Sequence, residues 1–444
     1  MGRHGRERDT FRLWRGALGW WHLALNGVLV AAGVFYAVTW SPRALLLVVG
    51  VAVAFLPFST ARLWLEHALR EHFDAPRLLP LFSGVAMLAD ALMVGQILTS
   101  RTLPAEPLLH GPSLTWVGPV WFSTFAILAI ALGVHRYLIA PLRRRFARMR
   151  PATAVDQGRR QFLRQATVFG AGAPFAASVS GANISYDFRL EQYDVEVPGW
   201  PRGLDGLRVA HLSDIHVGGS MDRPRLQRVA ALTNEARPDL VLHTGDFLTH
   251  RDGDFDAPLY EALSTIRAPH GQWACLGNHD FDDPRRLVRK LHGAGVRTLR
   301  NRLATVFIDG HEVEIAGIDY AFGRFQWEEI YARIVASWGP RRPVPRLLLN
   351  HDPTAFAALP EGCADLVLSG HTHGGQIGVQ LGTGNAVTLV GLVGVPDQGV
   401  FNRGEMRLFV TRCVGFYGYP MRIGIPPEVA LLRIRGSGSG ARAA

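Results

Sequence analysis

Five short segments of this chain combine carboxylate, amide and imidazole side chains, and each follows a short apolar run. The segments are Asp214-Ile215-His216, Gly245-Asp246, Gly277-Asn278-His279-Asp280, Asn350-His351-Asp352 and Gly370-His371-Thr372-His373. In open α/β sheets the loops that follow the carboxyl ends of the strands converge at one edge, where ligands bind. Few other folds bring five such distant segments together. The pattern therefore predicts an α/β domain with its site at that edge.

The apolar runs have the length and the turn signals of strands separated by helical patterns. The predicted strands are Leu207–Leu212, Asp239–His243, Gln272–Leu276, Val313–Ile318, Arg346–Leu349 and Asp365–Leu368. A helix is predicted after the first of them, with Asp222 as its N-cap residue ahead of Pro224. We expect this domain to cover residues 186–435 and to end in a flexible tail over 436–444.

The side chains in these segments suit a pair of divalent cations. Asp214, His216 and His373 are the predicted ligands of one ion. Asn278, His351 and His371 are the predicted ligands of the other, and Asp246 can bridge the two with its two oxygens. Mixed nitrogen and oxygen ligands favour manganese, iron or zinc, and the absence of cysteine from the segments argues against a closed structural zinc site.

This ligand set predicts hydrolysis of a phosphate ester. Two ions about 3.5–4 Å apart lower the pKa of a bridging water and hold both oxygens of an in-line displacement. The nucleophile would then be a hydroxide that bridges the metals. His279 follows Asn278 and is predicted to protonate the leaving oxygen or to stabilise charge on it. Asp280 is the candidate to orient that imidazole.

The first 150 residues contain four apolar stretches of the length that a helix needs to cross a bilayer, about 20 residues. They are Trp20–Trp40, Ala44–Leu65, Leu78–Thr99 and Leu114–Ile139. Arginines gather before the first stretch, between the second and third, and after the fourth. Because positive loops stay in the cytoplasm, both ends of this four-helix transmembrane module are predicted to be cytoplasmic.

The net charge of +10 does not indicate nucleic-acid binding. Residues 1–164 hold 19 Arg against eight Asp and Glu, so the whole excess lies around the apolar stretches. A nucleic-acid-binding domain should carry its basic groups on the globular part. We therefore predict membrane lipids rather than nucleic acid as partners.

Residues 151–185 link the two modules. Gly158-Arg159-Arg160-Gln161-Phe162-Leu163-Arg164 resembles a twin-arginine export motif, and a weakly apolar run, Ala166–Val179, follows it. One interpretation is a fifth crossing read by the twin-arginine export machinery, which places the catalytic domain on the outer face, tethered unless cleaved near Ala182. The alternative is a basic juxtamembrane segment and flexible linker, which leaves the domain on the cytoplasmic face.

The series of motifs resembles the calcineurin-like metallophosphoesterase superfamily. Gly370-His371-Thr372-His373-Gly374-Gly375-Gln376-Ile377, with Pro426-Pro427-Glu428, resembles its membrane-associated bacterial branch, which includes a twin-arginine-exported phosphodiesterase and a UDP-2,3-diacylglucosamine pyrophosphatase-like group. The resemblance covers roughly residues 185–435 and implies a two-sheet αββα sandwich with a dinuclear centre. The four-helix module departs from this branch, whose members more often carry one span or a signal.

Two other classes remain open from the sequence: an inert binding or sensor domain on the same scaffold, and a transporter with an accessory soluble domain. A membrane-tethered phosphoesterase accounts for more of the chain, because every expected ligand and His279 are present. An open site beside a membrane module suits a phosphodiester or pyrophosphate of a lipid or cell-envelope substrate. Arg285, Arg286 and Arg324 are candidates to hold a second phosphate.

Overall fold

The computed structural model describes residues 174–437, except for 182, 218–220, 250–255, 324–325, 381–385 and 417–420, and six isolated positions between 120 and 141. The first three predicted spans and the twin-arginine-like motif lie outside the described residues, and only scattered positions of the fourth span are described. Among the helices that are described, none has both the length and the apolar character needed to cross a membrane. The chain divides into two compact units, Met1–Val179 and Ser180–Ala444, and the second contains all five metal-binding segments.

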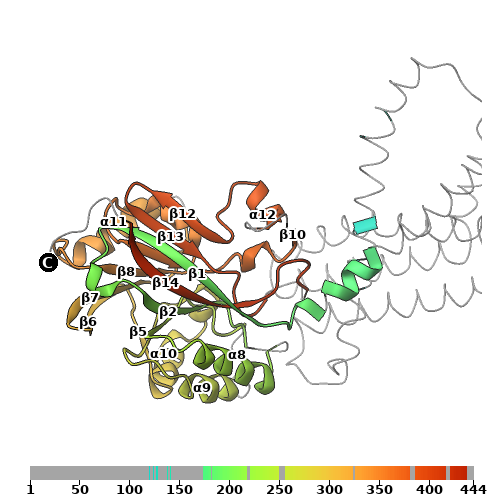
Figure 1. The fold of residues 1–444 in the computed structure, drawn as a ribbon, viewed down its shortest axis with the longest axis horizontal. Coiled ribbons are helices and arrows are strands. Elements are labelled where there is room, and N and C mark those ends of the chain that lie inside the picture. Colours follow the sequence, from blue (N-terminus) through green and yellow to red (C-terminus); the bar gives the residue numbers. More distant parts are fainter. Residues whose placement is uncertain are drawn as a thin grey trace, which may run out of the picture. The chain divides into compact units, whose positions relative to one another are not determined.

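Two six-stranded sheets form this second unit (Figure 1). The first has the order β1-β14-β2-β3-β4-β5, and its strands are parallel except where β14 meets β2. Its strands are β1 (Arg189–Pro198), β14 (Glu428–Ser437), β2 (Leu207–Leu212), β3 (Leu240–His243), β4 (Gln272–Ala274) and β5 (Val296–Thr298). The parallel run from β2 to β5 therefore points its carboxyl ends toward one edge.

The second sheet has the order β12-β13-β9-β8-β7-β6, with antiparallel pairs only at its two ends. Its strands are β12 (Gly399–Arg403), β13 (Met406–Val410), β9 (Leu366–Ser369), β8 (Arg346–Asn350), β7 (His311–Ile318) and β6 (Arg302–Ile308). A separate two-stranded ribbon pairs β10 (Gly378–Val379) with β11 (Val387–Thr388).

Three apolar cores give the unit its layers. Side chains from both sheets form the central core, among them Val209, Leu242, Leu347 and Leu368. On the outside of the first sheet a second core packs under helices α8 (Arg223–Glu235), α9 (Ala257–Ser264) and α10 (Pro284–Gly293). The third core lies between the second sheet and the helices α11 (Trp327–Ser337) and η5 (Pro353–Ala358). These layers agree with the predicted αββα sandwich.

All six predicted strands are present, within two residues at each end. The predicted helix is α8, and the Asp222 carboxylate caps it by accepting a hydrogen bond from the Arg225 N–H at 3.1 Å. Capping satisfies one of the free N–H groups of the first turn. The sequence did not predict β1, β5, β6, β12, β13 or β14. Four of these, β1, β5, β6 and β12, lie at the edge of a sheet, where one strand side lacks a partner.

The first and last strands of the unit lie side by side. β1 pairs with β14 in parallel over ten residues, from Arg189 opposite Glu428 to Pro198 opposite Ser437. Gly436 and Ser437, which we assigned to the flexible tail, belong to β14, and residues 438–444 lie outside the described residues. The Glu428 carboxylate fixes the start of this pairing by accepting hydrogen bonds from the Tyr193 hydroxyl at 2.7 Å and the Thr411 hydroxyl at 2.9 Å.

Candidate metal centre

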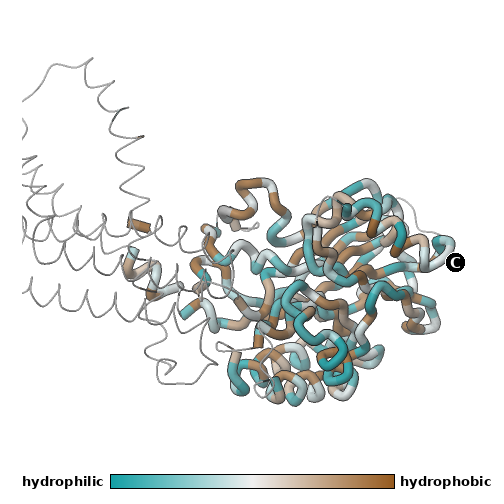
Figure 2. The backbone as a smooth tube through the Cα atoms, turned by 180° about the vertical axis from the view of Figure 1, so that it is seen from behind, coloured by the Kyte–Doolittle hydropathy of each residue, from teal (hydrophilic) through white to brown (hydrophobic). Residues whose placement is uncertain are grey.

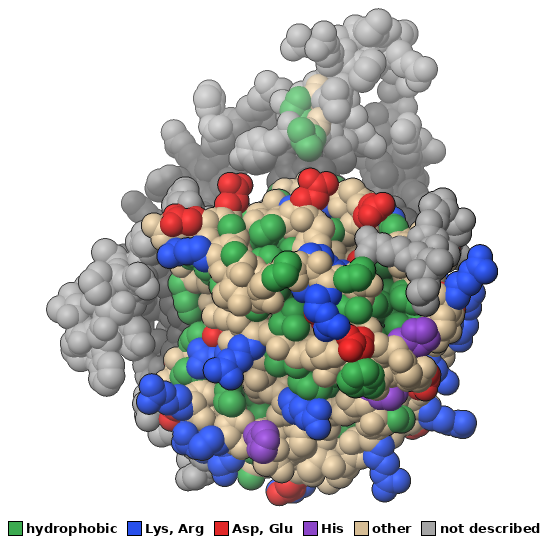
Figure 3. Space-filling view, turned by 90° about the vertical axis from the view of Figure 1, so that its left-hand side faces the viewer, with side chains coloured by type: hydrophobic (Ala, Val, Ile, Leu, Met, Phe, Trp, Pro, Cys, Tyr) green, Lys and Arg blue, Asp and Glu red, His purple; other side chains and the backbone are tan. Residues whose placement is uncertain are grey.

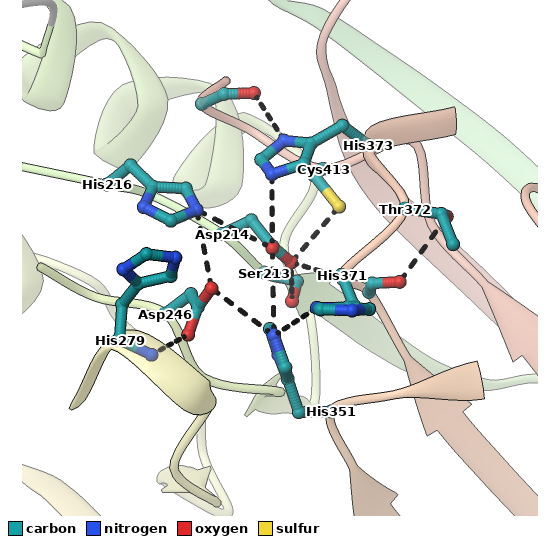
Figure 4. Close-up of polar contacts among 12 residues, drawn as sticks. Ser213, Asp214, His216, Asp246, His279, His351, His371, Thr372, His373 and Cys413 are labelled. Atoms are coloured by element: carbon teal, nitrogen blue, oxygen red, sulfur yellow. Dashed lines mark hydrogen bonds and ion pairs between the residues drawn. The ribbon is translucent and has the colours of Figure 1, made fainter. Parts of the chain in front are cut away.

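The five predicted segments meet at one edge of the sandwich (Figure 4). The loops after β2, β3 and β4 supply side chains from the first sheet, and those after β8 and β9 supply them from the second. Backbone hydrogen bonds join the loops: Asp214 N–H donates to the Gly245 carbonyl at 2.9 Å, and Gly370 N–H donates to the His351 carbonyl at 3.1 Å. Neighbouring loops of each sheet are therefore fixed to one another.

Asp214 lies at the middle of the first group of metal-binding side chains. Its Oδ1 atom is buried and faces the Nε2 atoms of His373 at 3.4 Å and of His216 at 3.8 Å. These distances exceed those of hydrogen bonds, and they leave space for a cation among the three atoms. The other oxygen, Oδ2, accepts a hydrogen bond from the His371 N–H at 2.8 Å, which fixes the orientation of the carboxylate.

Three groups of side chains in the described residues could each hold a metal ion, and Asp246 belongs to two of these groups. One contains Asp214, His216 and Asp246, and the other contains Asp246, His351 and His371. Its Oδ2 atom lies 3.4 Å from His216 Nε2 and 3.3 Å from His351 Nε2. Oδ1 accepts a hydrogen bond from the His279 N–H at 2.9 Å. The carboxylate that the sequence predicted as a bridge thus lies between the two sets of ligands.

His351 presents its Nε2 atom to the second group. Its Nδ1 lies 2.6 Å from the Thr244 carbonyl, and a carbonyl can only accept, so Nδ1 carries a proton. Nε2 then lies 3.1 Å from both Asn278 Oδ1 and His371 Nδ1. A partner at the far ring nitrogen is the usual way in which a protein orients a metal-binding histidine. His373 is held similarly, with Nδ1 3.2 Å from the Gly415 carbonyl.

The ligand loops have an unusual backbone. Five of the seven predicted ligands have positive φ angles: Asp214 (55°), His216 (50°), Asp246 (54°), His371 (66°) and His373 (52°). Each non-glycine residue in this region costs of the order of 1–3 kcal/mol, and such residues concentrate at functional sites. Because of these sharp turns, two ligands that are two residues apart in the sequence can both point toward the same metal ion.

Two motif glycines are required by space. A Cβ atom on Gly370 would lie 2.2 Å from Asp214 Oδ2 and 2.1 Å from Ser213 Oγ. One on Gly277 would lie 2.2 Å from Asp246 Oδ1. Real Cβ atoms do not approach other atoms this closely, so any larger residue would displace the carboxylates. The glycines that precede the ligands in the sequence motifs therefore define the ligand positions.

The electrostatics of the site suit cations. Asp214 and Asp246 are both buried, and burial alone would raise the pKa of each carboxyl group. The neighbouring imidazoles, His351 first among them, outweigh burial, so the pKa of both groups is lowered, that of Asp246 to about 2. Burial lowers the pKa of His351, but the two carboxylates raise it overall to about 10. Burial lowers the pKa of His373 to about 3, so its imidazole is neutral. Two buried carboxylates surrounded by imidazoles are stable only when positive charge compensates them, and these residues fit divalent cations.

Asp280 holds the backbone beside the ligands. Its carboxylate is buried and accepts hydrogen bonds from the backbone N–H groups of Gly277 (2.9 Å), Asp246 (2.8 Å) and Phe247 (2.9 Å). Burial, followed by the charge of Asp246, raises the Asp280 pKa to about 7. We expected Asp280 to orient the imidazole of His279. These three bonds hold the backbone of the loop that carries the bridging carboxylate.

A chain of hydrogen bonds reaches Asp214 from the core. His211 Nε2 lies 2.9 Å from Thr244 Oγ1, Thr244 Oγ1 donates to Ser213 Oγ at 2.7 Å, and the Ser213 hydroxyl donates to Asp214 Oδ2. Because both hydroxyl protons point toward Asp214, Nε2 of His211 must be the donor at the start of the chain. Burial lowers the pKa of His211 to about 3, which keeps this imidazole neutral.

Cys413 is a site residue that the sequence did not predict. Its thiol donates to Asp214 Oδ2 at 3.1 Å, and burial and the nearby carboxylate raise its pKa, so it stays protonated. Cys413 follows β13, which runs parallel to β9. The rule that site residues follow the carboxyl ends of parallel strands also predicts a site residue here, once β13 is recognised as a strand.

His279 lies beside the metal-binding groups. Its ring centroid is 5.1 Å from that of His216, and the imidazole belongs to none of the three groups of metal-binding side chains found in the described residues (Figure 4). Tyr320, which the sequence did not indicate, has its ring 6.1 Å from His351 and 6.0 Å from His371. His279 thus lies beside a ligand of one predicted ion, and Tyr320 lies beside two ligands of the other.

The structure describes two of the three arginines proposed to hold a second phosphate. Arg286 forms an ion pair with the buried carboxylate of Asp256 at 3.2 Å. Arg285 is exposed on α10, and Arg324 lies outside the described residues. The structure therefore gives a structural role to Arg286 and leaves Arg285 as a surface residue.

Comparison with known proteins decides the family. Residues 207–375 match the family model of the calcineurin-like phosphoesterases. The chain contains a calcineurin-like metallophosphoesterase domain. It is therefore a metal-dependent phosphoester hydrolase.

Three curated relatives match most of this domain. A Danio rerio transmembrane protein with a metallophosphoesterase domain is 33% identical over 249 residues, which cover 53% of this chain and 55% of the relative. The UDP-2,3-diacylglucosamine pyrophosphatase LpxG of Chlamydia muridarum is 26% identical and covers 55% of this chain and 88% of the relative. The phosphodiesterase YaeI of Escherichia coli is 27% identical and covers 51% and 82%.

Proposed function

We propose that this hydrolase is a membrane-tethered enzyme with two metal ions, and that it cleaves a phosphodiester or pyrophosphate bond of a lipid or cell-envelope substrate. The position of Asp246 carries the dinuclear part of the proposal. One of its oxygens lies 3.3–3.4 Å from an imidazole of each ligand group. A carboxylate in that position can bind two cations at once, which a single-ion site does not need.

We assign the ligands to the two ions as the sequence suggests. Asp214, His216 and His373 would hold one ion, and Asn278, His351 and His371 the other, with Asp246 shared. Manganese, iron and zinc match this mixture of imidazole and oxygen donors. When bound, two such cations supply a water of lowered pKa and hold the phosphate oxygens for in-line displacement.

His279 would act on the leaving group. Its backbone N–H is fixed on Asp246 Oδ1 at 2.9 Å, which places the imidazole at the mouth of the ligand groups. From there it can donate a proton to the leaving oxygen or stabilise the charge that forms on it. Tyr320 stands on the other side, against His351 and His371, and would contact the substrate.

The substrate class is supported by two relatives, whose names assign them a pyrophosphatase and a phosphodiesterase activity. We expect the purified full chain with manganese to hydrolyse bis-p-nitrophenyl phosphate, and to prefer lipid-linked over soluble phosphodiesters. Failure to hydrolyse any phosphodiester would leave an inert binding domain. A strong preference for phosphoproteins or small soluble monoesters would refute the substrate class.

Tethering is supported by the four apolar stretches with alternating arginine content, and by the name of the Danio rerio relative. We propose that Arg159 and Arg160 direct export and that the catalytic domain faces outward, with the cytoplasmic face as the alternative. Alkaline phosphatase and fluorescent reporters fused after Ala182 and after residue 440 would locate the domain. A domain found inside, both with and without Arg159→Lys/Arg160→Lys, would refute export.

A further inference from the structure

Residues 374–402 are almost without charge. Asp397 is the only Asp, Glu, Lys or Arg in these 29 residues, although 19% of the chain is charged, so about five would be expected. Asp397 is itself buried and accepts a hydrogen bond from the Thr388 hydroxyl. The segment begins directly after His373 and contains β10, β11 and α12 (Leu389–Leu392). Figure 2 shows its apolar character around α12.

The aliphatic side chains of this segment face solvent. Val393 is 77% exposed, Leu392 71% and Val379 62%, and Val387 and Ile377 are also exposed. We call the described residues 377–380 and 386–393 the apolar finger; residues 381–385 between them lie outside the described part of the chain. Hydrogen bonds hold it together: the Thr388 hydroxyl accepts from Gly391 N–H at 2.9 Å and caps α12, and the amide of Gln398, just after the finger, donates to the Ala386 carbonyl at 3.1 Å. Apart from Gln380, the exposed side chains of its described residues are aliphatic.

The opposite end of the domain has a different surface. Figure 3 views the domain from the end where Figure 1 places β6, β7 and α11, and there arginine and acidic side chains lie among the hydrophobic ones. Single exposed hydrophobic residues such as Phe307 on β6, which is 64% exposed, are ordinary in soluble proteins. A charge-free group of exposed aliphatic residues marks a contact surface.

The finger is joined to the part of the domain that follows the N-terminal module in the chain. Gly378 N–H donates to the Ile423 carbonyl and Ile423 N–H donates to the Gln376 carbonyl, both at 2.9 Å. The neighbouring Arg422 N–H donates to Ser185 Oγ at 2.7 Å. A backbone strip over 421–424 thus connects the finger to the first residues of the domain.

We propose that the apolar finger inserts into the surface of the lipid bilayer that holds the N-terminal module. The inference rests on the proposed membrane tethering with its fifth crossing. That crossing ends at about Val179, so the Ser185 contact of the strip follows only a few residues later in the chain. Aliphatic side chains without charged neighbours bind the headgroup–acyl boundary through buried apolar area. Since His373 precedes the finger, insertion would place the metal centre beside the lipids that it hydrolyses.

Fluorescence quenching tests the insertion directly. All three cysteines of the chain are buried, so Val393→Cys offers one accessible thiol for an environment-sensitive fluorophore. The labelled full chain is reconstituted into nanodiscs with or without lipids that carry a quencher on the acyl chain. Phe307→Cys, similarly exposed, is the matched control. We expect severalfold quenching at position 393 and none at 307. If the quencher does not change the fluorescence at position 393, the proposal is overturned. This also holds if the probe is buried against protein rather than lipid.

A second pair of variants connects the finger to turnover. Leu392→Ser/Val393→Ser should lower hydrolysis of a bilayer-embedded phosphodiester by about tenfold, because apolar area drives interfacial binding. The same variant should hydrolyse soluble bis-p-nitrophenyl phosphate at the parental rate, as should Phe307→Ser on both substrates. Equal turnover of the embedded substrate by the double variant and the parent contradicts the proposal. Quenching without any hydrolysis would instead refute the proposed function and leave the insertion standing.

Discussion

Removing the charge of Asp246 should empty the centre without unfolding the domain. Asp246→Asn keeps the size of the side chain and an oxygen that can accept the His279 N–H bond now made at 2.9 Å. It removes the negative charge that lies 3.3–3.4 Å from an imidazole of each ligand group. We therefore expect an intact fold with little bound metal.

The size of the loss follows from Coulomb's law. Two unit charges 4 Å apart interact by about 4 kcal/mol at an effective dielectric constant near 20, and a divalent cation doubles this to roughly 8 kcal/mol. If the amide dipole and local relaxation recover half, about 4 kcal/mol remains, which corresponds to roughly a thousandfold weaker metal binding. Hydrolysis at a fixed manganese concentration should fall accordingly.

Metal content by mass spectrometry, hydrolysis of bis-p-nitrophenyl phosphate and thermal unfolding would be measured together. Asp319→Asn is a matched control, because Asp319 follows β7 as Asp246 follows β3. The Asp319 carboxylate instead binds the Arg300 guanidinium at 2.8 Å, and it belongs to no metal-binding group in the described residues. The control should keep its metal and its rate within a few-fold. An Asp246→Asn protein with full activity and undiminished metal would refute the shared-ligand argument.

Further predictions concern the neighbours of Asp246. His279→Ala should retain both ions and lose about 10²–10⁴ in rate, the usual contribution of a general acid; loss of metal would make His279 a ligand. Gly370→Ala should lower metal affinity and destabilise the domain by about 1–3 kcal/mol, because its Cβ would lie 2.2 Å from Asp214 Oδ2; unchanged melting temperature and metal content would contradict this. Cys413→Ala removes a hydrogen-bond donor to Asp214 and should weaken metal binding by about 10–100-fold. Cys413→Ser keeps a donor and should weaken metal binding less. Equal effects of the two substitutions would show that the thiol only fills space.

Much of the centre could be predicted from the sequence because its ligands directly follow apolar strands. The short runs before Asp214, Asp246 and His371 have the composition of buried parallel strands, and the carboxyl ends of such strands share one edge. The structure gathers all seven predicted ligands there. The identity of the metals and the role of each ligand are matters for the experiments above.

The positions that escaped prediction depend on tertiary contacts. β14 lies between β1 and β2, although it comes last in the chain, and no local pattern encodes a partner about 240 residues away. From the sequence Cys413 has only the setting of a buried thiol, because β13 before it is not recognisable as a strand. The role of Asp280 also depends on packing, since its carboxylate binds backbone amides of a loop more than 30 residues earlier in the chain. The sequence suggested only a contact with the neighbouring His279.

The apolar finger is visible in the sequence only as a glycine-rich stretch. Its glycines indicate turns, and the missing charge becomes informative once the structure shows which aliphatic side chains face outward. Hydrophobicity without a regular period cannot distinguish a buried strand from an exposed surface.

The place of β14 in the middle of a sheet has a consequence for biosynthesis. β1 and β2 are made early, but they lie on opposite sides of β14, so the first sheet cannot close until residues 428–437 have left the ribosome. Contacts of such long sequence separation form slowly, and the loops that hold Asp214 and Asp246 extend from this same sheet. A nonsense codon shortly before Glu428 would therefore abolish the whole enzyme, even though every metal ligand had already been translated.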